Sequence, residues 1–85
     1  MEFDDVKFSV VGLKQVMRGL DADELETVYL ADDTDLSIRN KIMEKARECG
    51  VPIVHIPNMR MLGDAAGIDV KAAVAGVAKA EEAFE

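Results

Sequence analysis

The sequence has a single cysteine, Cys49, no tryptophan, and only three phenylalanines and one tyrosine. One cysteine cannot form a disulfide within the chain or complete a metal site built from several cysteines. A lone thiol is compatible with a reducing cytoplasm. Because aromatic side chains are scarce, aliphatic residues and methionine must build the core.

Long apolar runs and an N-terminal targeting signal are also missing. No apolar run approaches the roughly 18 residues that a membrane span requires. The first five residues include three acids, whereas a secretory signal peptide begins with positive charge. We therefore expect a cytoplasmic protein with no membrane partner, and residues 1–85 forming one domain with a small core.

Basic residues are outnumbered, and the formal net charge is −7. The acidic excess lies in two segments, residues 21–26 and 81–85, which contain no basic residue. Between Val6 and Leu20, in contrast, there are basic residues and no acidic one. An acidic loop and tail on one side of the fold would leave a basic face on another. We expect Lys14, Arg18 and Arg39 to share a face with residues 68–70, away from both acidic segments.

Apolar runs alternate with helical patterns along the chain, which predicts an α/β fold. Strands are expected at residues 8–11, 25–31, 52–56 and 72–77, and helices at residues 13–20, 35–49 and 59–66. The last strand consists of small apolar residues that suit either structure. The alternation of elements favours a strand there, and a helix would contradict this topology.

Glycine and polar residues predict where the helices begin and end. Gly19 is expected at the C-terminal cap of the first helix, and Gly50 at the end of the second. Thr34 or Asp35 is expected to cap the start of the second helix, and Asn58 the start of the third. The second helix should bury a stripe at helical spacing, which consists of Ile38, Ile42, Ala46 and Cys49.

The segment from Gly12 to Arg18 combines a turn residue with a basic helix start. Lys14 and Arg18 are four residues apart and share a helix face, with Gln15 beside them. The first N–H groups of such a helix have no partner within it and carry partial positive charge. On spacing alone, a surface helix with two solvated cations is the better explanation of the pattern.

Three segments together resemble the ribosomal protein L-seven-Ae/L-thirty-e superfamily, in particular its small bacterial members. They are residues 12–18, residues 30–35, and residues 62–70 leading into the alanine-rich strand. The resemblance extends over residues 6–78, and the pattern Leu-Gly-x-Ala-x-Gly at residues 62–67 is its most specific part.

The resemblance implies a three-layer α/β/α sandwich with a central mixed sheet of about four strands. It also implies a non-catalytic protein that binds a structured RNA, the kink-turn. This kink-turn is of ribosomal or riboswitch type, so ribosomal RNA is one of the expected partners. The residues that fall on the family's RNA contacts are Gly12, Lys14, Gln15, Arg18, Asp35, Arg39, Ile68, Asp69 and Val70. Three positions depart from the family pattern: Arg18 replaces a lysine, Leu13 a small polar residue, and Arg39 an apolar one.

Other interpretations stay open at this point. A member of the same fold could bind another protein through its acidic surface, and a small enzyme is conceivable although no catalytic triad or phosphate loop is present. Asp35 is equally well explained as a helix cap, and Ile68 and Val70 as core. His55 is expected to be a half-buried strand residue. We expect no cofactor, no metal, no DNA partner, and a monomer.

Overall fold

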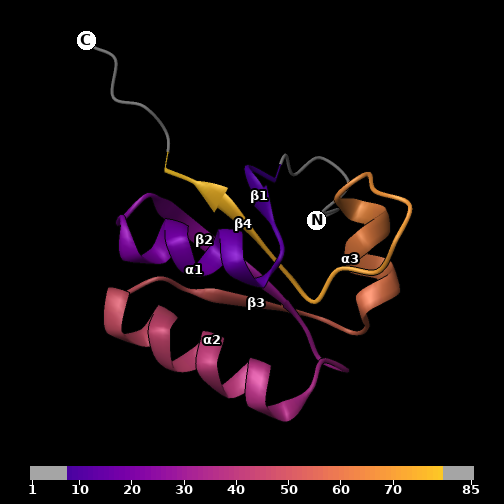
Figure 1. Ribbon diagram of the computed structural model, residues 1–85, viewed down its shortest axis with the longest axis horizontal. Coiled ribbons are helices and arrows are strands. Elements are labelled where there is room, and N and C mark those ends of the chain that lie inside the picture. Colours follow the sequence, from indigo (N-terminus) through magenta and orange to yellow (C-terminus); the bar gives the residue numbers. More distant parts are fainter. Residues whose placement is uncertain (1–7, 80–85) are drawn as a thin grey trace, which may run out of the picture.

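The computed structural model describes residues 8–79, in which four strands and three helices follow one another along the chain (Figure 1). The elements are β1 (Val10–Val11), α1 (Leu13–Asp21), β2 (Leu25–Ala31), α2 (Leu36–Cys49), β3 (Ile53–Ile56), α3 (Met59–Ala65) and β4 (Val74–Ala78). The expected strand at residues 72–77 is therefore β4, and the predicted topology is confirmed. The acidic tail at residues 81–85 lies outside the described residues.

The four strands form one mixed sheet with the order β1-β4-β2-β3. β2 pairs in parallel with β3, and β4 runs antiparallel to both β1 and β2. Tyr29, in the middle of β2, has Val54 on one side and Ala75 on the other. The central strands are thus β2 and β4, which are also the most buried.

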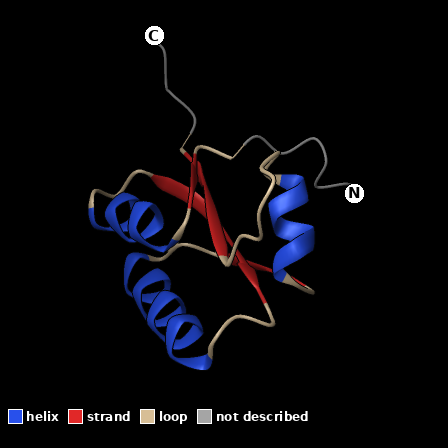
Figure 2. Ribbon diagram, turned by 45° about the vertical axis from the view of Figure 1, so that its right-hand side comes forward, coloured by secondary structure: helices blue, strands red, loops and turns tan. Residues whose placement is uncertain are grey.

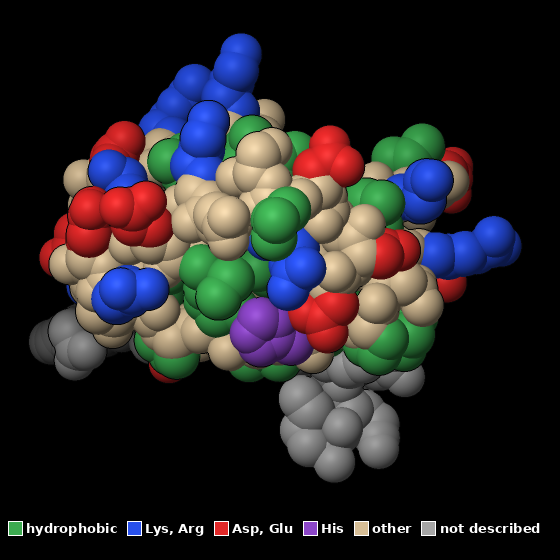
Figure 3. All heavy atoms as spheres, turned by 90° about the horizontal axis from the view of Figure 1, so that it is seen from below, with side chains coloured by type: hydrophobic (Ala, Val, Ile, Leu, Met, Phe, Trp, Pro, Cys, Tyr) green, Lys and Arg blue, Asp and Glu red, His purple; other side chains and the backbone are tan. Residues whose placement is uncertain are grey.

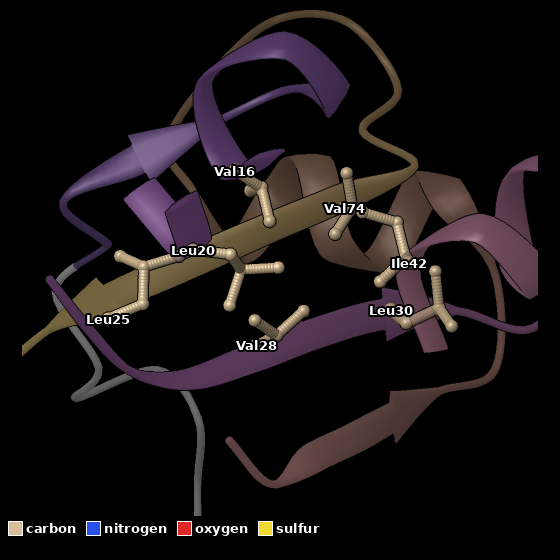
Figure 4. Close-up of a cluster of buried hydrophobic side chains, with 7 residues drawn as sticks. All are labelled: Val16, Leu20, Leu25, Val28, Leu30, Ile42 and Val74. Atoms are coloured by element: carbon tan, nitrogen blue, oxygen red, sulfur yellow. The ribbon is translucent and has the colours of Figure 1, made fainter. Parts of the chain in front are cut away.

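Helices cover both faces of the sheet: α1 and α2 lie on one face and α3 on the other (Figure 2). Successive strand residues point to opposite faces, so Val28 and Leu30 contact the side of α1 and α2, while Tyr29 and Ala31 contact the side of α3. The first core cluster is drawn in Figure 4 and consists of Val16, Leu20, Leu25, Val28, Leu30, Ile42 and Val74. This arrangement confirms the three-layer α/β/α sandwich.

The ends of α2 and α3 follow the predicted signals. Gly50 ends α2 in the left-handed conformation, with φ of 71°. Asn58 begins α3, and its side-chain oxygen accepts a hydrogen bond from Met61 N at 2.8 Å. The longest described helix, α2, has 14 residues, and no helix within residues 8–79 is long and apolar enough to cross a membrane.

The prediction that Gly19 caps α1 is wrong. Gly19 is buried inside the helix, which continues to Asp21 and ends at Ala22. A Cβ atom at Gly19 would lie 2.9 Å from Leu25 Cγ, so glycine is present to admit a core side chain. Tertiary packing, which the local sequence does not show, explains this residue.

The first strand is shorter than expected, because at Ser9 a side-chain hydrogen bond to β4 takes the place of a backbone one. The Ser9 N–H donates to Gly76 O at 2.8 Å, but it is the Ser9 hydroxyl oxygen that accepts from Ala78 N, at 2.9 Å. β1 therefore covers only Val10–Val11 instead of residues 8–11. Pro52 similarly stays outside β3, although its carbonyl accepts a hydrogen bond from Val28 N.

The loop between α3 and β4 returns along α3 in backbone contact with it. Ile68 N donates to Gly63 O, and Ala72 N donates to Met59 O, both at 3.1 Å. A Cβ atom at Gly63 would lie 2.2 Å from Val70 O, which leaves no room for any side chain at this position. Gly63 thus determines how closely residues 68–72 approach the helix.

We expect Gly63→Ala to lower the free energy of unfolding by about 1–3 kcal/mol, because the added methyl group must displace the loop backbone. Helix propensity alone predicts the opposite, a gain of about 1 kcal/mol. Urea denaturation followed by circular dichroism measures the sign. Asp64→Ala is the control, since this exposed carboxylate in the last helical turn makes no favourable interaction with the helix dipole. A Gly63→Ala protein as stable as its parent would contradict the close approach.

Candidate nucleic-acid interface

The three sequence segments singled out above meet at the entry to β4. Gly12 N donates to Val74 O, and Ala31 N donates to Ala73 O, both at 2.9 Å. The hydroxyl of Thr34, which is buried, donates to the same Ala73 oxygen at 3.4 Å. The start of α1, the connection from β2 to α2, and the loop from α3 to β4 are therefore neighbours in space.

At the start of α1 the backbone turns sharply, and three polar side chains along this helix are exposed. Gly12 has φ of 112°, a conformation that favours glycine. A Cβ atom there would lie 2.8 Å from Gln15 Oε1, so the Gln15 side chain lies back over the first turn of the helix. Lys14 and Arg18 are exposed and form no ion pair within residues 8–79. Lys14 thus lies in the first turn, beside the positive end of the helix, whereas Arg18 lies in the last turn.

Between β2 and α2, neighbouring carboxylates have different roles. Asp33 Oδ1 accepts a hydrogen bond from Met59 N at 2.9 Å, and so caps α3 from a distant segment. Asp32 Oδ1 lies 2.8 Å from Nδ1 of His55. Asp35 occupies the N-cap position of α2, but its side chain makes no capping hydrogen bond. Asp35 therefore has the predicted N-cap position, but its side chain does not cap the helix and its carboxylate is exposed.

Arg39 lies one helical turn after Asp35, whose carbonyl accepts its backbone N–H at 2.9 Å. The residue is half-buried, and its Nε atom is buried without a hydrogen-bond partner in the described structure. An unsatisfied buried donor costs roughly 1–3 kcal/mol. The sequence identified Arg39 as unusual, but it gave no sign that the guanidinium lacks a partner.

The loop residues 68–70 divide between core and surface. Ile68 is half-buried and packs against the cluster that contains Tyr29 and Leu62, so the core interpretation holds for it. Asp69 is exposed, and 68% of Val70 is exposed, which excludes the core interpretation for Val70. Leu36, the first residue of α2, is 65% exposed, but it was not predicted as a contact residue from the sequence. Its position outside the apolar stripe of α2 indicates an exposed side chain and could have identified it.

The acidic residues from Asp21 onward lie at the end of α1 opposite Gly12. Nine residues at a rise of about 1.5 Å separate the two ends by roughly 13 Å. Asp21 pairs with Lys45, and Asp23 pairs with Lys79. The hydrogen bond to Asp21 raises the pKa of Lys45 above its ordinary value. These two carboxylates are thus already occupied by lysines of the same chain.

His55 and Cys49 are the single histidine and the single cysteine of the sequence. The prediction of a half-buried His55 is wrong, since 47% of its side chain is exposed on the surface shown in Figure 3. It lies on β3, which is an edge strand of the sheet formed by the described residues. Cys49 is half-buried, with Sγ 3.4 Å from Leu20 O. Within residues 8–79, no group of three His, Cys, Asp or Glu residues is placed to hold a metal ion.

The different roles of neighbouring carboxylates can be measured. Asp33→Ala removes the acceptor of Met59 N and should lower the free energy of unfolding by about 1 kcal/mol, as the loss of a helix cap does. Asp35→Ala breaks no side-chain hydrogen bond and should cost less than about 0.5 kcal/mol. Denaturant unfolding of both variants against the parent tests this difference. Equal losses would show that Asp35 caps α2 after all.

Relatives of this chain occur among named bacterial proteins. An RNA-binding protein of Geobacillus sp. (strain WCH70) is 41% identical over 69 residues, which are 81% of this chain and 84% of the relative. An RNA-binding protein of Caldanaerobacter subterraneus subsp. tengcongensis is 41% identical over 66 residues, 78% of this chain and 80% of the relative.

Two solved structures share the fold. A protein of unknown function from Bacillus halodurans has a TM-score of 0.76 and 27% identity, over 82% of this chain and 70% of that one. The 15.5kD RNA binding protein of Giardia lamblia has a TM-score of 0.77 and 26% identity, over 84% of this chain and 60% of that one. The model of the ribosomal protein L7Ae/L30e/S12e/Gadd45 family matches residues 5–84, nearly the whole sequence, and the chain therefore belongs to that family.

Proposed function

We propose that the protein binds RNA without catalysing a reaction, and that it recognises the kink-turn, a sharply bent internal loop with tandem sheared G·A pairs. The convergence of three segments on Ala73 and Val74 is the observation that carries this proposal. The relatives that are named RNA-binding proteins support RNA as the partner. The proposed contact residues lie in or next to these segments and are Gly12, Lys14, Gln15, Arg18, Asp35, Arg39, Ile68, Asp69 and Val70.

The chemistry of the interface suits a kinked RNA better than a regular duplex. A duplex of RNA hides the major-groove edges of its bases in a deep, narrow groove, whereas a kink exposes guanine edges and unstacked bases. Lys14 and Gln15 can donate hydrogen bonds to the guanine acceptors O6 and N7. The exposed carboxylate of Asp35 can accept from a base amino group, and the first turn of α1 can approach a phosphate.

Apolar side chains complete the proposed contact surface. Val70 and Leu36 are both strongly exposed. Val70 lies on the loop before β4 and Leu36 begins α2, and the hydrogen bond from Thr34 to Ala73 connects these two segments. An extruded base needs such side chains against its ring face, because it has lost its stacking partners. Exposure of these two aliphatic residues therefore supports contact with unstacked bases.

The alternative of a protein-binding acidic surface receives less support. Asp21 and Asp23, in the acidic segment, already pair with Lys45 and Lys79. Figure 3 shows red and blue side chains interspersed, without a large area of one sign, on the face that it presents. We propose that the protein acts as a monomer in the cytoplasm, on a kink-turn of ribosomal or riboswitch type.

Lys14 and Arg18 should contribute to RNA binding in different ways. Lys14→Ala should weaken binding to a kink-turn RNA by about 1–3 kcal/mol if the lysine contacts a guanine edge. Arg18→Ala should weaken binding to all RNAs and reduce the salt dependence by about one unit, as the loss of a phosphate contact does. Titrations of the parent and both variants at several salt concentrations measure these effects.

The control RNA has the sheared G·A pairs replaced by Watson–Crick pairs. The loss caused by Lys14→Ala should shrink on this RNA, because the parent protein has then lost the same contact. Affinity for the kinked RNA should fall as salt rises, with a shallow slope, since the net charge of the protein opposes approach. A parent protein that fails to bind the kinked RNA at low salt would overturn this function and leave the fold intact.

Arg39→Met should separate stability from binding. Methionine has a similar length and leaves no unsatisfied donor, so the free energy of unfolding should stay equal or rise by up to about 1–3 kcal/mol. RNA affinity should nevertheless fall, and the salt dependence should decrease by about one unit, if the guanidinium meets a phosphate. Chemical denaturation and RNA titration of the same preparation test both points. Unchanged RNA affinity would remove Arg39 from the proposed contact residues.

A further inference from the structure

A hollow of about 370 Å³ lies between α3 and the loop that follows it. Its lining combines two basic residues, two acidic residues and one exposed aliphatic residue, namely Arg60, Lys71, Asp64, Asp69 and Val70. Two of these residues come from α3, and the other three are consecutive in the loop. Only Asp69 and Val70 belong to the contact residues proposed above, so the hollow extends that surface toward α3.

The shape of the hollow depends on backbone contacts. The loop is held against α3 by the hydrogen bonds from Ile68 to Gly63 and from Ala72 to Met59. Because Gly63 has no side chain, the Val70 carbonyl can lie against the helix. The carbonyl of Val70 therefore faces α3 at a set distance, and the charged side chains on each side of it line a preformed hollow.

The charged groups of the hollow form no ion pair with other described residues. In the described part of the chain, none of Arg60, Asp64, Asp69 and Lys71 takes part in an ion pair. When acidic and basic side chains share a surface but do not pair with one another, each can bind a different group of a ligand. A ligand that fits must offer hydrogen-bond donors to the carboxylates and acceptors to the cations.

We propose that this hollow holds a guanine base, supplied by an unpaired nucleotide of the bound RNA. Guanine offers two adjacent donors, N1–H and the N2 amino group, which suit the Asp64 or Asp69 carboxylate. It offers the acceptors O6 and N7 to Arg60 or Lys71. Val70 covers part of the ring face. This inference rests on the proposed function, because it takes the base from the same RNA.

The other bases match this set of groups less well. Adenine has one amino donor beside the acceptor N1, so a carboxylate facing that edge would meet a lone pair. Uracil has two carbonyl acceptors and one donor, and offers no amino group. Only guanine places two donors side by side and two acceptors side by side. The hollow should therefore distinguish guanine from adenine even when each is presented as a single nucleotide.

The first experiment uses guanosine and adenosine monophosphate as probes of the intact protein. Amide chemical shifts in two-dimensional NMR should change at residues 60–72 and saturate, with guanosine monophosphate binding at least about fivefold more tightly. Equal affinities for the two nucleotides would overturn the guanine proposal. Changes confined to the first turn of α1 would also overturn it, because they would place the nucleotide at the cations there.

The second experiment compares Asp64→Asn with Glu44→Gln, and both variants lose one negative charge. Glu44 lies on α2 in a separate hollow with Met17 and Lys41, so it serves as a matched control. Asp64→Asn should reduce the preference for guanosine monophosphate to within about twofold, whereas Glu44→Gln should leave it unchanged. Identical behaviour of the two variants would show that general charge repulsion is being measured, and would overturn the pocket.

Kink-turn RNAs that carry guanine or adenine at each unpaired loop position, one at a time, test the source of the base. At one position, guanine should bind the parent protein at least about fivefold more tightly, and Asp64→Asn should remove this preference. A parent that binds the kinked RNA without preference at any position supports the proposed function and overturns the guanine pocket. A parent that binds guanosine monophosphate but ignores kinked RNA would overturn RNA as the source, together with the proposed function.

Discussion

Two adjacent carbonyl groups at the entry to β4 accept hydrogen bonds from two other parts of the chain. Val74 O accepts from Gly12, and Ala73 O accepts from Ala31 and Thr34. These bonds also set the register of β4, whose successive residues face opposite layers of the sandwich. A shift of β4 by one residue would exchange Val74 and Ala75 between the two core clusters. The same bonds that hold the core in register therefore hold the candidate RNA surface together.

Glycine makes two close approaches possible, one in the core and one at the surface. Leu25 lies between α1 and β4, and a Cβ atom at either Gly19 or Gly76 would come within 2.9 Å of it. At Gly63, the missing side chain lets the loop backbone lie against α3. The first approach closes the core under α1, and the second shapes the proposed guanine pocket. Both depend on space rather than on an unusual backbone conformation.

The acidic composition of the chain does not prevent a local site for an anionic partner. Asp21 and Asp23 are paired with lysines, and Asp33 caps α3, so these carboxylates are partly neutralised or committed. Lys14 and Arg18 have no such partners in the described residues. We therefore expect the proposed RNA to be bound through few phosphate contacts and several base contacts. The net negative charge weakens long-range attraction, so hydrogen bonds to the bases must provide the specificity.

The order and type of every described element followed from the sequence, because apolar periodicity and glycine or proline punctuation report on local structure. The strand at residues 72–77 needed the alternation of elements as well. Asn58 and Gly50 were predicted as helix ends, since capping depends on neighbouring residues alone. Gly19 was misplaced because its neighbour Leu25 is a tertiary contact. The layers of the sandwich, and the residues of the candidate site, came from the resemblance to a family.

By itself, then, the sequence determined the secondary structure and showed which segments deserved attention. Only the tertiary structure decided which polar side chains form hydrogen bonds within the protein and which apolar side chains are exposed. Asp33 is bound to α3, Asp35 is unbound, Ile68 is half-buried, and Val70 is exposed. These pairs have similar side chains and lie two residues apart, so composition and spacing cannot separate them. Their fates differ because a hydrogen bond or a burial contact depends on groups that the fold brings from distant parts of the chain.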